Sequence, residues 1–321
     1  MHVFRRLRSG VQAVPSGCVA TIGVFDGVHL GHRRILDRVR EQAAARDLPS
    51  LVFSFEPTPQ EVMSPQQPPA RLMRLREKFL ALQSLGIDHL YCPPFEQHLQ
   101  ELSPEAFIEQ LLVGLLGVRH LVVGDDFRFG ARRGGDLAML KQAAGRCGFE
   151  AHAMASVIVD GVRVSSTAVR EALAAGDMRR AQRLLGRPYS ISGRVVSGDR
   201  LGRKLGFPTA NVLMKHNRPA LSGIYAVEVH GLGAKPLPGA ASLGVRPTVT
   251  SIPRPCLEVH LLDFDRDIYG AHLQVNFLHK LRDEEKYADV ETLRRQIAVD
   301  VESVSKYFLT AKAQRREGCA T

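Results

Sequence analysis

Two histidines, His29 and His32, stand in a run that reads GVFDGVHLGH over residues 23–32. The run follows an apolar, β-rich stretch and leads into a segment with helical periodicity. Its small residues let a ligand approach the backbone, and the first turn of a helix binds phosphate well. Histidines at this spacing can both donate hydrogen bonds to charge developing on that phosphate. A tight turn with two surface histidines is the structural alternative, and the combined glycine and histidine spacing favours the phosphate site.

A second candidate for phosphate binding is the run VSSTAVR at residues 164–170. Hydroxyl side chains cap the start of a helix, so Ser166 or Thr167 would be an ordinary N-cap in most proteins. Arg170 follows one turn later, and its delocalised charge suits the β- and γ-phosphates of a nucleotide. Capping is the better interpretation of this run alone. The histidine run in the same half of the chain makes phosphate binding the better one.

The second half carries glycines spaced four apart, Gly198, Gly202 and Gly206, with basic residues such as Lys204 between them. The spacing matches neither a P-loop nor a dinucleotide-binding fingerprint, and by itself it fits a hairpin with a solvated basic tip. Further on, residues 257–261 alternate between apolar and polar side chains. Glu258 and His260 therefore share the face opposite the buried one. A glutamate exposed on a strand usually has no chemical role.

The elements that must position these residues follow two different patterns. The first half alternates helical segments with strands, which we expect at residues 19–25, 51–55, 87–92, 120–123 and 149–159. This alternation predicts a doubly wound, mainly parallel sheet, whose ligands bind beyond the carboxyl ends of the strands. From about residue 186, short alternating runs follow one another at residues 189–196, 223–229, 240–245, 257–262 and 273–278. They predict a small antiparallel β-barrel, capped by an amphipathic helix over residues 290–307.

Length and composition agree with this division. The chain has 321 residues, about twice the ~150 of an ordinary domain, so we expect two domains, with the boundary between residues 186 and 187. No apolar run reaches the ~18 residues of a membrane span, and the first residues lack the apolar core of a signal peptide. The five cysteines are widely spaced and include no Cys-x-x-Cys, which predicts a reduced cytoplasmic protein without structural zinc. The net charge of +10 suits anionic partners: nucleic acid, a membrane surface or phosphorylated small molecules.

Taken in order, these runs resemble the family of bacterial bifunctional riboflavin kinases/FAD synthetases. Residues 23–32 are similar to the HxGH signature of the nucleotidyltransferase superfamily, and residues 164–170 to its SSTxxR signature. FEPTP at residues 55–59 resembles the second ligand loop, and VGDDFRFG at residues 123–130 the loop after the fourth strand. Residues 194–211 resemble the ATP-binding loop and PTAN motif of riboflavin kinases, and LEVH at residues 257–260 their catalytic strand. The resemblance extends over about residues 15–310.

The resemblance implies a two-site enzyme. A nucleotidyltransferase-type, Rossmann-like domain at residues 1–186 would transfer AMP from ATP to FMN, giving FAD and pyrophosphate. A barrel domain with a C-terminal helix at residues 187–321 would phosphorylate riboflavin with a second ATP to give FMN. Both steps would need Mg²⁺, and the excess positive charge fits several bound phosphates. Neither a nucleic acid nor a membrane is implied as a partner.

The resemblance also assigns roles to individual residues. His29 and His32 would stabilise the α-phosphate, and Glu258 would be the base that activates the ribityl 5′-hydroxyl. Thr209 and Asn211 would bind Mg²⁺, a hard cation that prefers oxygen ligands. Flavin contacts are expected from Thr58, Phe127 and Arg282. The expected nucleotide and phosphate ligands are Gly23, Phe25, Asp26, Gly31, Asp126, Ser165, Ser166, Thr167, Arg170, Gly198, Gly202, Lys204 and Gly206.

Two alternatives remain open at this point. A nucleotidyltransferase with a single activity on another phosphate substrate would not need the PTAN barrel, which argues against it. A basic nucleic-acid-binding protein would need aromatic side chains that stack on bases, whereas aromatic residues make up 6% of the chain and tryptophan is absent. Incubation with riboflavin, ATP and Mg²⁺, followed by separation of the flavins, distinguishes all three hypotheses.

Overall fold

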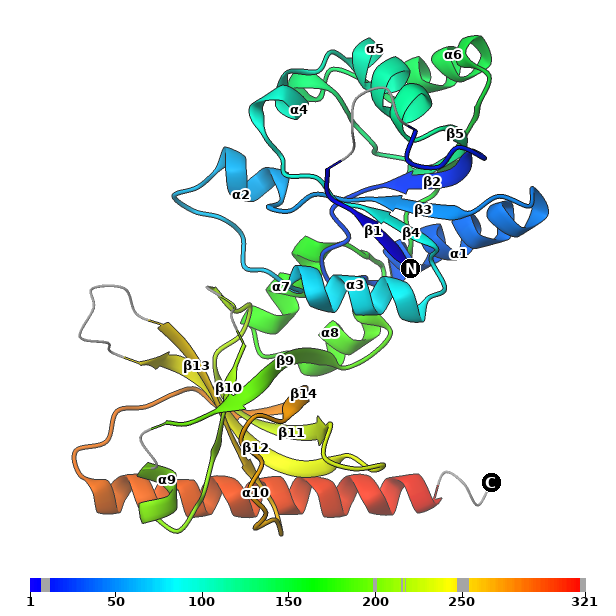
Figure 1. The fold of residues 1–321 in the computed structure, drawn as a ribbon. Helices are drawn as coiled ribbons and strands as arrows, with labels where there is room; N and C mark the ends of the chain where they lie inside the picture. The colour runs from blue at the N-terminus through cyan, green and yellow to red at the C-terminus, as the bar shows by residue number, and fades with distance from the viewer. Residues whose placement is uncertain (7–11, 199–200, 215, 217, 247–253, 318–321) are drawn as a thin grey trace. The chain divides into compact units, whose positions relative to one another are not determined.

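A six-stranded parallel sheet organises the first half of the chain, with the strand order β1-β4-β3-β2-β5-β6 (Figure 1). Its strands are β1 (His2–Phe4), β2 (Cys18–Ile22), β3 (Ser50–Phe53), β4 (His89–Tyr91), β5 (Val118–Gly124) and β6 (Glu150–Met154). The computed structural model describes residues 1–6, 12–198, 201–214, 216, 218–246 and 254–317. The predicted parallel sheet is confirmed, and the short strand β1, which has too few residues to show a periodicity, adds one strand beside β4.

Helices cover both faces of this sheet, which explains why its central strands β2 and β3 are buried throughout. On one face, Leu36 of α1 (Leu30–Ala45) and Leu82 of α3 (Leu75–Ser84) pack with Val52 of β3. On the other face, η1 (Phe107–Leu115) and α6 (Leu137–Cys147) pack against the alternate strand residues. The remaining helices of this unit are α2 (Pro59–Met63), α4 (Gln97–Glu101), α5 (Pro104–Ala106) and η2 (Ala131–Arg133).

The strand predicted over residues 149–159 is shorter than expected. β6 ends at Met154, and the chain then forms a separate hairpin of β7 (Ile158–Val159) and β8 (Val162–Arg163). Its two-residue turn has φ of +51° at Asp160 and +74° at Gly161, the left-handed pair that a tight hairpin requires. An Asp-Gly pair is the usual sequence for such a turn, so this local signal identifies the break.

A closed antiparallel barrel forms the second half, in the order β10-β13-β12-β11-β14-β9. The strands are β9 (Tyr189–Val196), β10 (Ala210–Leu213), β11 (Gly223–His230), β12 (Leu237–Arg246), β13 (Arg254–Leu261) and β14 (His272–Arg282). The predicted barrel is therefore confirmed. β10 was expected as part of a ligand loop, and it instead closes the barrel between β9 and β13. The short helix α9 (Leu201–Lys204) precedes β10, and the terminal helix α10 (Val290–Glu317) begins where predicted and is longer.

The chain divides into two compact units, residues 1–69 with 73–166 and residues 70–72 with 167–321. The second unit includes α7 (Ser166–Ala174) from Thr167 onward and all of α8 (Met178–Leu185), which contacts β9 and β14. The boundary predicted from sequence instead assigns both helices to the first domain. The limits of each active domain stay a prediction.

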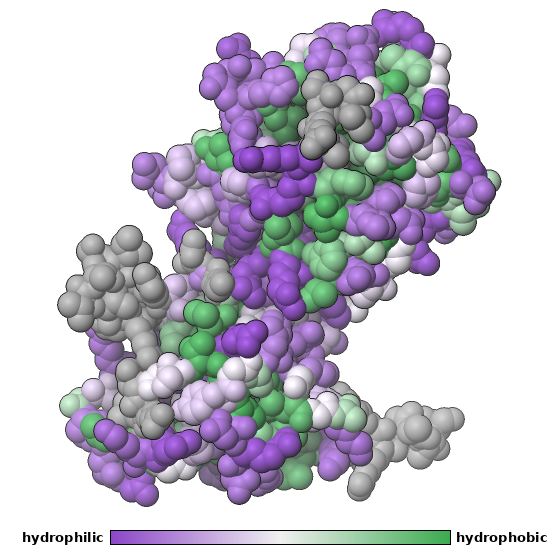
Figure 2. All heavy atoms as spheres, in the orientation of Figure 1, coloured by the Kyte–Doolittle hydropathy of each residue, from purple (hydrophilic) through white to green (hydrophobic). Residues whose placement is uncertain are grey.

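The visible surface is mainly hydrophilic. Figure 2 shows polar and charged residues over most of the face it presents, with hydrophobic residues scattered among them. Within the part of the chain that the structure describes, no helix has the length and apolar character needed to cross a membrane.

Candidate active sites

The histidine run lies where the sequence places it, at the carboxyl end of β2 and the start of α1. His29 is the N-cap of α1: its Nδ1 accepts a hydrogen bond of 3.3 Å from the backbone N–H of His32. An imidazole that accepts through Nδ1 carries its proton on Nε2 when neutral. The Nε2–H of His29 can therefore donate a hydrogen bond to a phosphate oxygen. Gly31 suits this arrangement because a Cβ there would lie 3.3 Å from the His29 ring.

The two imidazoles form one stacked unit. Their ring centroids are 3.6 Å apart with an interplanar angle of 14°, and the Phe25 ring lies 4.9 Å from that of His32. Burial lowers the pKa of His32 well below its usual range, and the nearby His29 and Lys78 lower that pKa further. His32 is therefore neutral at pH 7, and in that form it can donate an N–H without carrying a charge.

The loop between β2 and α1 is held in a strained conformation. Phe25 and Val28 adopt φ values of +50° and +42°, which L-residues rarely adopt. Such conformations cost about 1–3 kcal/mol each and persist where the surroundings determine them. Both side chains are almost completely buried, at 1% and 2% exposure. Their packing holds the loop in place beside the histidine pair.

Asp26 supports this loop, and the phosphate contact expected of it stays a prediction. One carboxylate oxygen accepts a hydrogen bond of 2.9 Å from the backbone N–H of Met73, and the side chain is 4% exposed. The carbonyl oxygen of Asp26 accepts a hydrogen bond of 2.9 Å from the Ser166 hydroxyl. This bond joins Ser166 of the SSTxxR run to the histidine loop within the first unit.

The arginine of the SSTxxR run also has a partner within the protein. Arg170 lies one turn into α7, in the second unit, where its Nε donates a hydrogen bond of 2.6 Å to the carbonyl of Ala70. The phosphate-binding roles of Ser165, Thr167 and Arg170 stay predictions.

Other candidates in the first unit have local structural partners. Thr58 is the N-cap of α2: its hydroxyl accepts from the Glu61 backbone N–H, and the Glu61 carboxylate accepts from the Thr58 backbone N–H at 2.9 Å. Asp126 forms an ion pair of 2.6 Å with Arg163 of β8, a residue that sequence reasoning did not select. The ring of Phe127 stacks on Phe129 at 5.5 Å. Ligand contacts by these residues stay predictions.

On the barrel, strand pairing brings three predicted residues together. Glu258 of β13 lies opposite Asn211 of β10 in the strand register. The hydroxyl of Thr209 donates a hydrogen bond of 3.3 Å to Oε2 of Glu258. Leu257 and Val259 are buried at 0% and 1% exposure, so Glu258 lies on the outer face of the barrel, as the alternation predicted. We call Thr209, Asn211 and Glu258 the barrel cluster.

The neighbours of the barrel cluster explain several sequence features. A Cβ on Gly198 would clash with the Asn211 amide, and one on Gly202 with the Phe207 carbonyl, so these glycines permit close approach to the cluster. Gly206 has φ of +87°, which favours glycine. The thiol of Cys256 lies 3.8 Å from Glu258 Oε1. Lys204 ends α9 and is exposed.

Sequence reasoning noted His260 without giving it a role. Its Nδ1 lies 2.8 Å from the carbonyl oxygen of Pro208, which directly precedes Thr209. Because a carbonyl only accepts, the Nδ1 must carry the proton. The period-two pattern placed His260 beside Glu258, and only the fold showed what it contacts.

Arg282 connects β14 to α10. Its Nε and Nη2 donate to the two carboxylate oxygens of Asp300 at 2.9 and 2.6 Å, and its Nη1 donates to the Asp283 carbonyl at 2.9 Å. All three guanidinium nitrogens thus have partners within the protein. The flavin contact expected of Arg282 stays a prediction.

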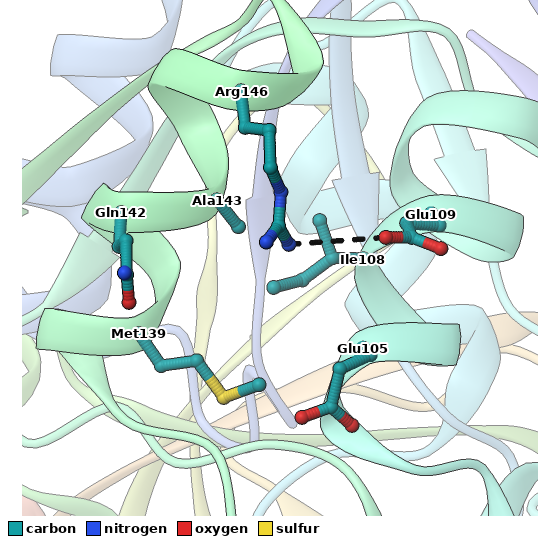
Figure 3. A pocket seen from close by; sticks show the side chains of 7 residues that line it. All are labelled: Glu105, Ile108, Glu109, Met139, Gln142, Ala143 and Arg146. Carbon is teal, nitrogen blue, oxygen red and sulfur yellow. Dashed lines mark ion pairs between the residues drawn. The ribbon is translucent and has the colours of Figure 1, made fainter.

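A cavity of about 160 Å³ lies apart from the predicted site residues, between η1 and α6 (Figure 3). Glu109 and Arg146, which form an ion pair of 3.8 Å, contribute to its lining.

Among the described residues, no group of three or more histidine, cysteine, aspartate or glutamate side chains is arranged to hold a metal ion. The hydroxyl and amide oxygens of the barrel cluster fit Mg²⁺ that is bound mainly through substrate phosphates.

Fold and geometry together define a class of protein: a parallel-sheet unit with a histidine-capped helix, joined to a barrel with a polar Thr-Asn-Glu cluster. The FAD synthetase family matches residues 11–168, and the riboflavin kinase family matches residues 185–308. The chain is 48% identical over 308 residues to the bifunctional riboflavin kinase/FMN adenylyltransferase of Escherichia coli K12, covering 96% of this chain and 98% of that one. The Pseudomonas fluorescens protein of the same description is 50% identical over 285 residues, covering 89% and 91%.

A solved structure shares the architecture. A crystal structure described as a macrolide-efflux protein from Streptococcus pneumoniae has a TM-score of 0.82 and 27% identity, covering 95% of this chain and 99% of that chain. The chain belongs to the family of bifunctional riboflavin kinases/FMN adenylyltransferases. It phosphorylates riboflavin with ATP to give FMN, and it adenylylates FMN with ATP to give FAD and pyrophosphate.

Proposed function

We propose that the two reactions occur at the two sites described above, adenylyl transfer beside His29 and His32 and riboflavin phosphorylation at the barrel cluster. The observation that best supports this assignment is the strand register that sets Glu258 opposite Asn211, with the Thr209 hydroxyl 3.3 Å from the Glu258 carboxylate. A base and oxygen ligands for a cation are the groups that phosphoryl transfer requires.

In adenylyl transfer, the phosphate of FMN attacks the α-phosphorus of ATP and pyrophosphate leaves. The Nε2–H of His29 donates a hydrogen bond to an α-phosphate oxygen. The orientation of the imidazole ring is set because Nδ1 caps α1. His32, stacked on His29, is a second neutral donor. Donors fixed before the reaction stabilise the charge that grows in the transition state at little reorganisation cost.

In riboflavin phosphorylation, Glu258 accepts the proton of the riboflavin 5′-hydroxyl as its oxygen attacks the γ-phosphorus of ATP, and ADP leaves as the bond between the β–γ bridging oxygen and the γ-phosphorus breaks. Thr209 and Asn211 would hold Mg²⁺, which would neutralise part of the phosphate charge when bound. The hydrogen bond between Thr209 and Glu258 places the carboxylate beside these ligands. We place the enzyme in the cytoplasm, because its five cysteines include no Cys-x-x-Cys and the four described ones form no disulfide.

The test is Glu258→Gln, which retains the shape of the side chain and removes its ability to accept a proton. General-base assistance contributes ~10²–10⁴ in rate, so FMN formation should fall by about that factor while riboflavin affinity changes much less. FAD formation from supplied FMN should continue at the parent rate. Glu228→Gln is the matched control, because Glu228 also lies half-buried on a barrel strand, β11. A Glu258→Gln enzyme that phosphorylates riboflavin within about threefold of the parent would refute the assignment.

A further inference from the structure

Lys78 is a buried lysine that the roles assigned above leave unexplained. It lies on α3 in the first unit, and it is 2% exposed, whereas lysines ordinarily keep the ammonium group in water. Its Nζ donates a hydrogen bond of 3.0 Å to the hydroxyl of Ser54, a residue with no exposed surface. Burial of an ammonium is costly, so it occurs where neighbouring groups compensate the charge.

The hydrogen bonds of Lys78 lead to the loop between β2 and α1. Ser54 directly follows β3, and its hydroxyl donates a hydrogen bond of 3.1 Å to the carbonyl of Val24. The preceding residue, Gly23, donates its backbone N–H to the Phe53 carbonyl at 3.0 Å. Lys78, Ser54 and Val24 therefore form a buried chain that ends within the loop leading to His29.

Lys78 also acts electrostatically on His32. The groups that shift the pKa of His32 besides burial are His29, at the start of α1, and Lys78, from α3. The cation is therefore close enough to resist protonation of His32, whose Nδ1 is buried without a partner among the described residues. A phosphate that binds beside the pair would meet the same positive charge, which in a buried setting is weakly screened.

We propose that Lys78 is a positioning residue for adenylyl transfer, holding the loop at residues 23–29 through Ser54 and placing a buried positive charge beside His29 and His32. The inference rests on the proposed function, in which these histidines bind the α-phosphate. Lys78 contributes in two separable ways: the hydrogen-bonded chain sets the loop geometry, and the ammonium charge favours both the neutral form of His32 and the anionic transition state.

Three substitutions separate these contributions. Lys78→Met removes charge and donor at similar length, Lys78→Arg retains the charge, and Ser54→Ala breaks the chain while retaining the charge. Lys141→Met, at an exposed lysine on α6 of the same unit, is the matched control. The measurements are kcat and KM for FAD formation from FMN, from the lowest pH at which each variant stays folded up to pH 8.5, thermal unfolding, and FMN formation from riboflavin as the internal control.

We expect Lys78→Met to lower kcat for FAD formation by about 10–100-fold, comparable to the loss of one transition-state donor. The acid limb of its pH profile should move to higher pH, because removing the cation makes His32 easier to protonate and the neutral form is the active one. Ser54→Ala should lower the rate by about 3–10-fold, the effect of one hydrogen bond, with the acid limb at the parent position. Lys78→Arg should retain the parent pH profile, and Lys141→Met should match the parent throughout.

A Lys78→Met enzyme with the parent rate, or with a lower rate and an unmoved acid limb, would overturn the inference. If Lys78→Met unfolds the first unit, the other two variants test the proposal. A parent rate in Ser54→Ala would refute it, and so would an acid limb displaced from the parent position in Lys78→Arg. His32→Ala distinguishes failure of the inference from failure of the proposed site. If His32→Ala leaves FAD formation intact, the site itself is wrong. If it lowers that rate about 100-fold while the Lys78 variants do not, only the role of Lys78 fails.

Discussion

His29 combines two functions in a single side chain. Its Nδ1 caps α1, and this same hydrogen bond leaves the proton on Nε2, where a phosphate can accept it. Histidine is an uncommon N-cap, since serine, threonine, aspartate and asparagine are preferred there. An aspartate would cap equally well and would repel the phosphate, so the choice of histidine agrees with an anionic ligand.

Substitutions at His29 should separate capping from catalysis. Asparagine caps a helix well and lacks a donor at the Nε2 position, so His29→Asn should keep the parent stability and lose FAD formation by ~10²–10³-fold. His29→Ala should lose the same activity and about 1 kcal/mol of stability in addition. Urea unfolding and FAD formation from FMN measure the two effects. Equal activity in parent and His29→Asn would show that the histidine serves the helix alone.

At the scale of elements, the PTAN segment shows how a short strand can build a site. β10 has four residues, and its pairing with β13 brings Asn211 opposite Glu258. Its first residue, Ala210, directly follows Thr209, whose hydroxyl reaches the same carboxylate. The turn before β10 needs a separate anchor, because a four-residue strand alone constrains it weakly. The bond of 2.8 Å between His260 and the Pro208 carbonyl provides that anchor.

Substitution of His260 tests this anchor. His260→Leu removes the donor, and a net hydrogen bond of about 0.5–1.5 kcal/mol corresponds to a loss of up to roughly 10-fold in riboflavin phosphorylation. His260→Asn places an N–H close to the position of Nδ1 and should restore most of the rate. FAD formation from FMN should be unchanged in both. If the two variants phosphorylate riboflavin equally, the contact with Pro208 does not position Thr209.

At the scale of the whole molecule, the second compact unit is larger than the barrel. α8 buries Met178, Ala181, Leu184 and Leu185, and it contacts β9 and β14. A barrel that begins at residue 187 would therefore leave apolar surface on those strands without its cover. Burying a large aliphatic side chain contributes about 1.5–3 kcal/mol, so the helix accounts for a substantial part of the stability of the unit.

Two fragments test where the kinase domain begins. Both residues 167–321 and residues 187–321 should phosphorylate riboflavin once folded, because the barrel cluster lies within each. The longer fragment should unfold at a higher temperature and resist aggregation, since α8 covers β9 and β14. Thermal unfolding and light scattering make the comparison. Equal midpoints would favour the boundary at residue 186, and a folded fragment 167–321 without kinase activity would count against a separable kinase.

Sequence by itself determined the order of elements and the motifs at their ends. The apolar strand runs, the alternation around Glu258 and the histidine spacing are local patterns, because side-chain direction repeats every two residues in a strand and every 3.6 in a helix. The glycines of the PTAN loop were also visible locally, although only the structure showed that Gly198 and Gly202 make room for their neighbours.

Tertiary structure decided which distant residues meet. Thr209 and Glu258 are separated by 49 positions, and Ser54 and Lys78 by 24, so no short-range pattern links either pair. Lys78 follows Glu77 and precedes an apolar run, and nothing in that context distinguishes it from a solvated helix lysine. Burial and hydrogen bonding are properties of the packed molecule, because they depend on what other elements place around a side chain. For that reason the buried lysine, the anchor at His260 and the supporting role of Asp26 became visible only in the folded chain.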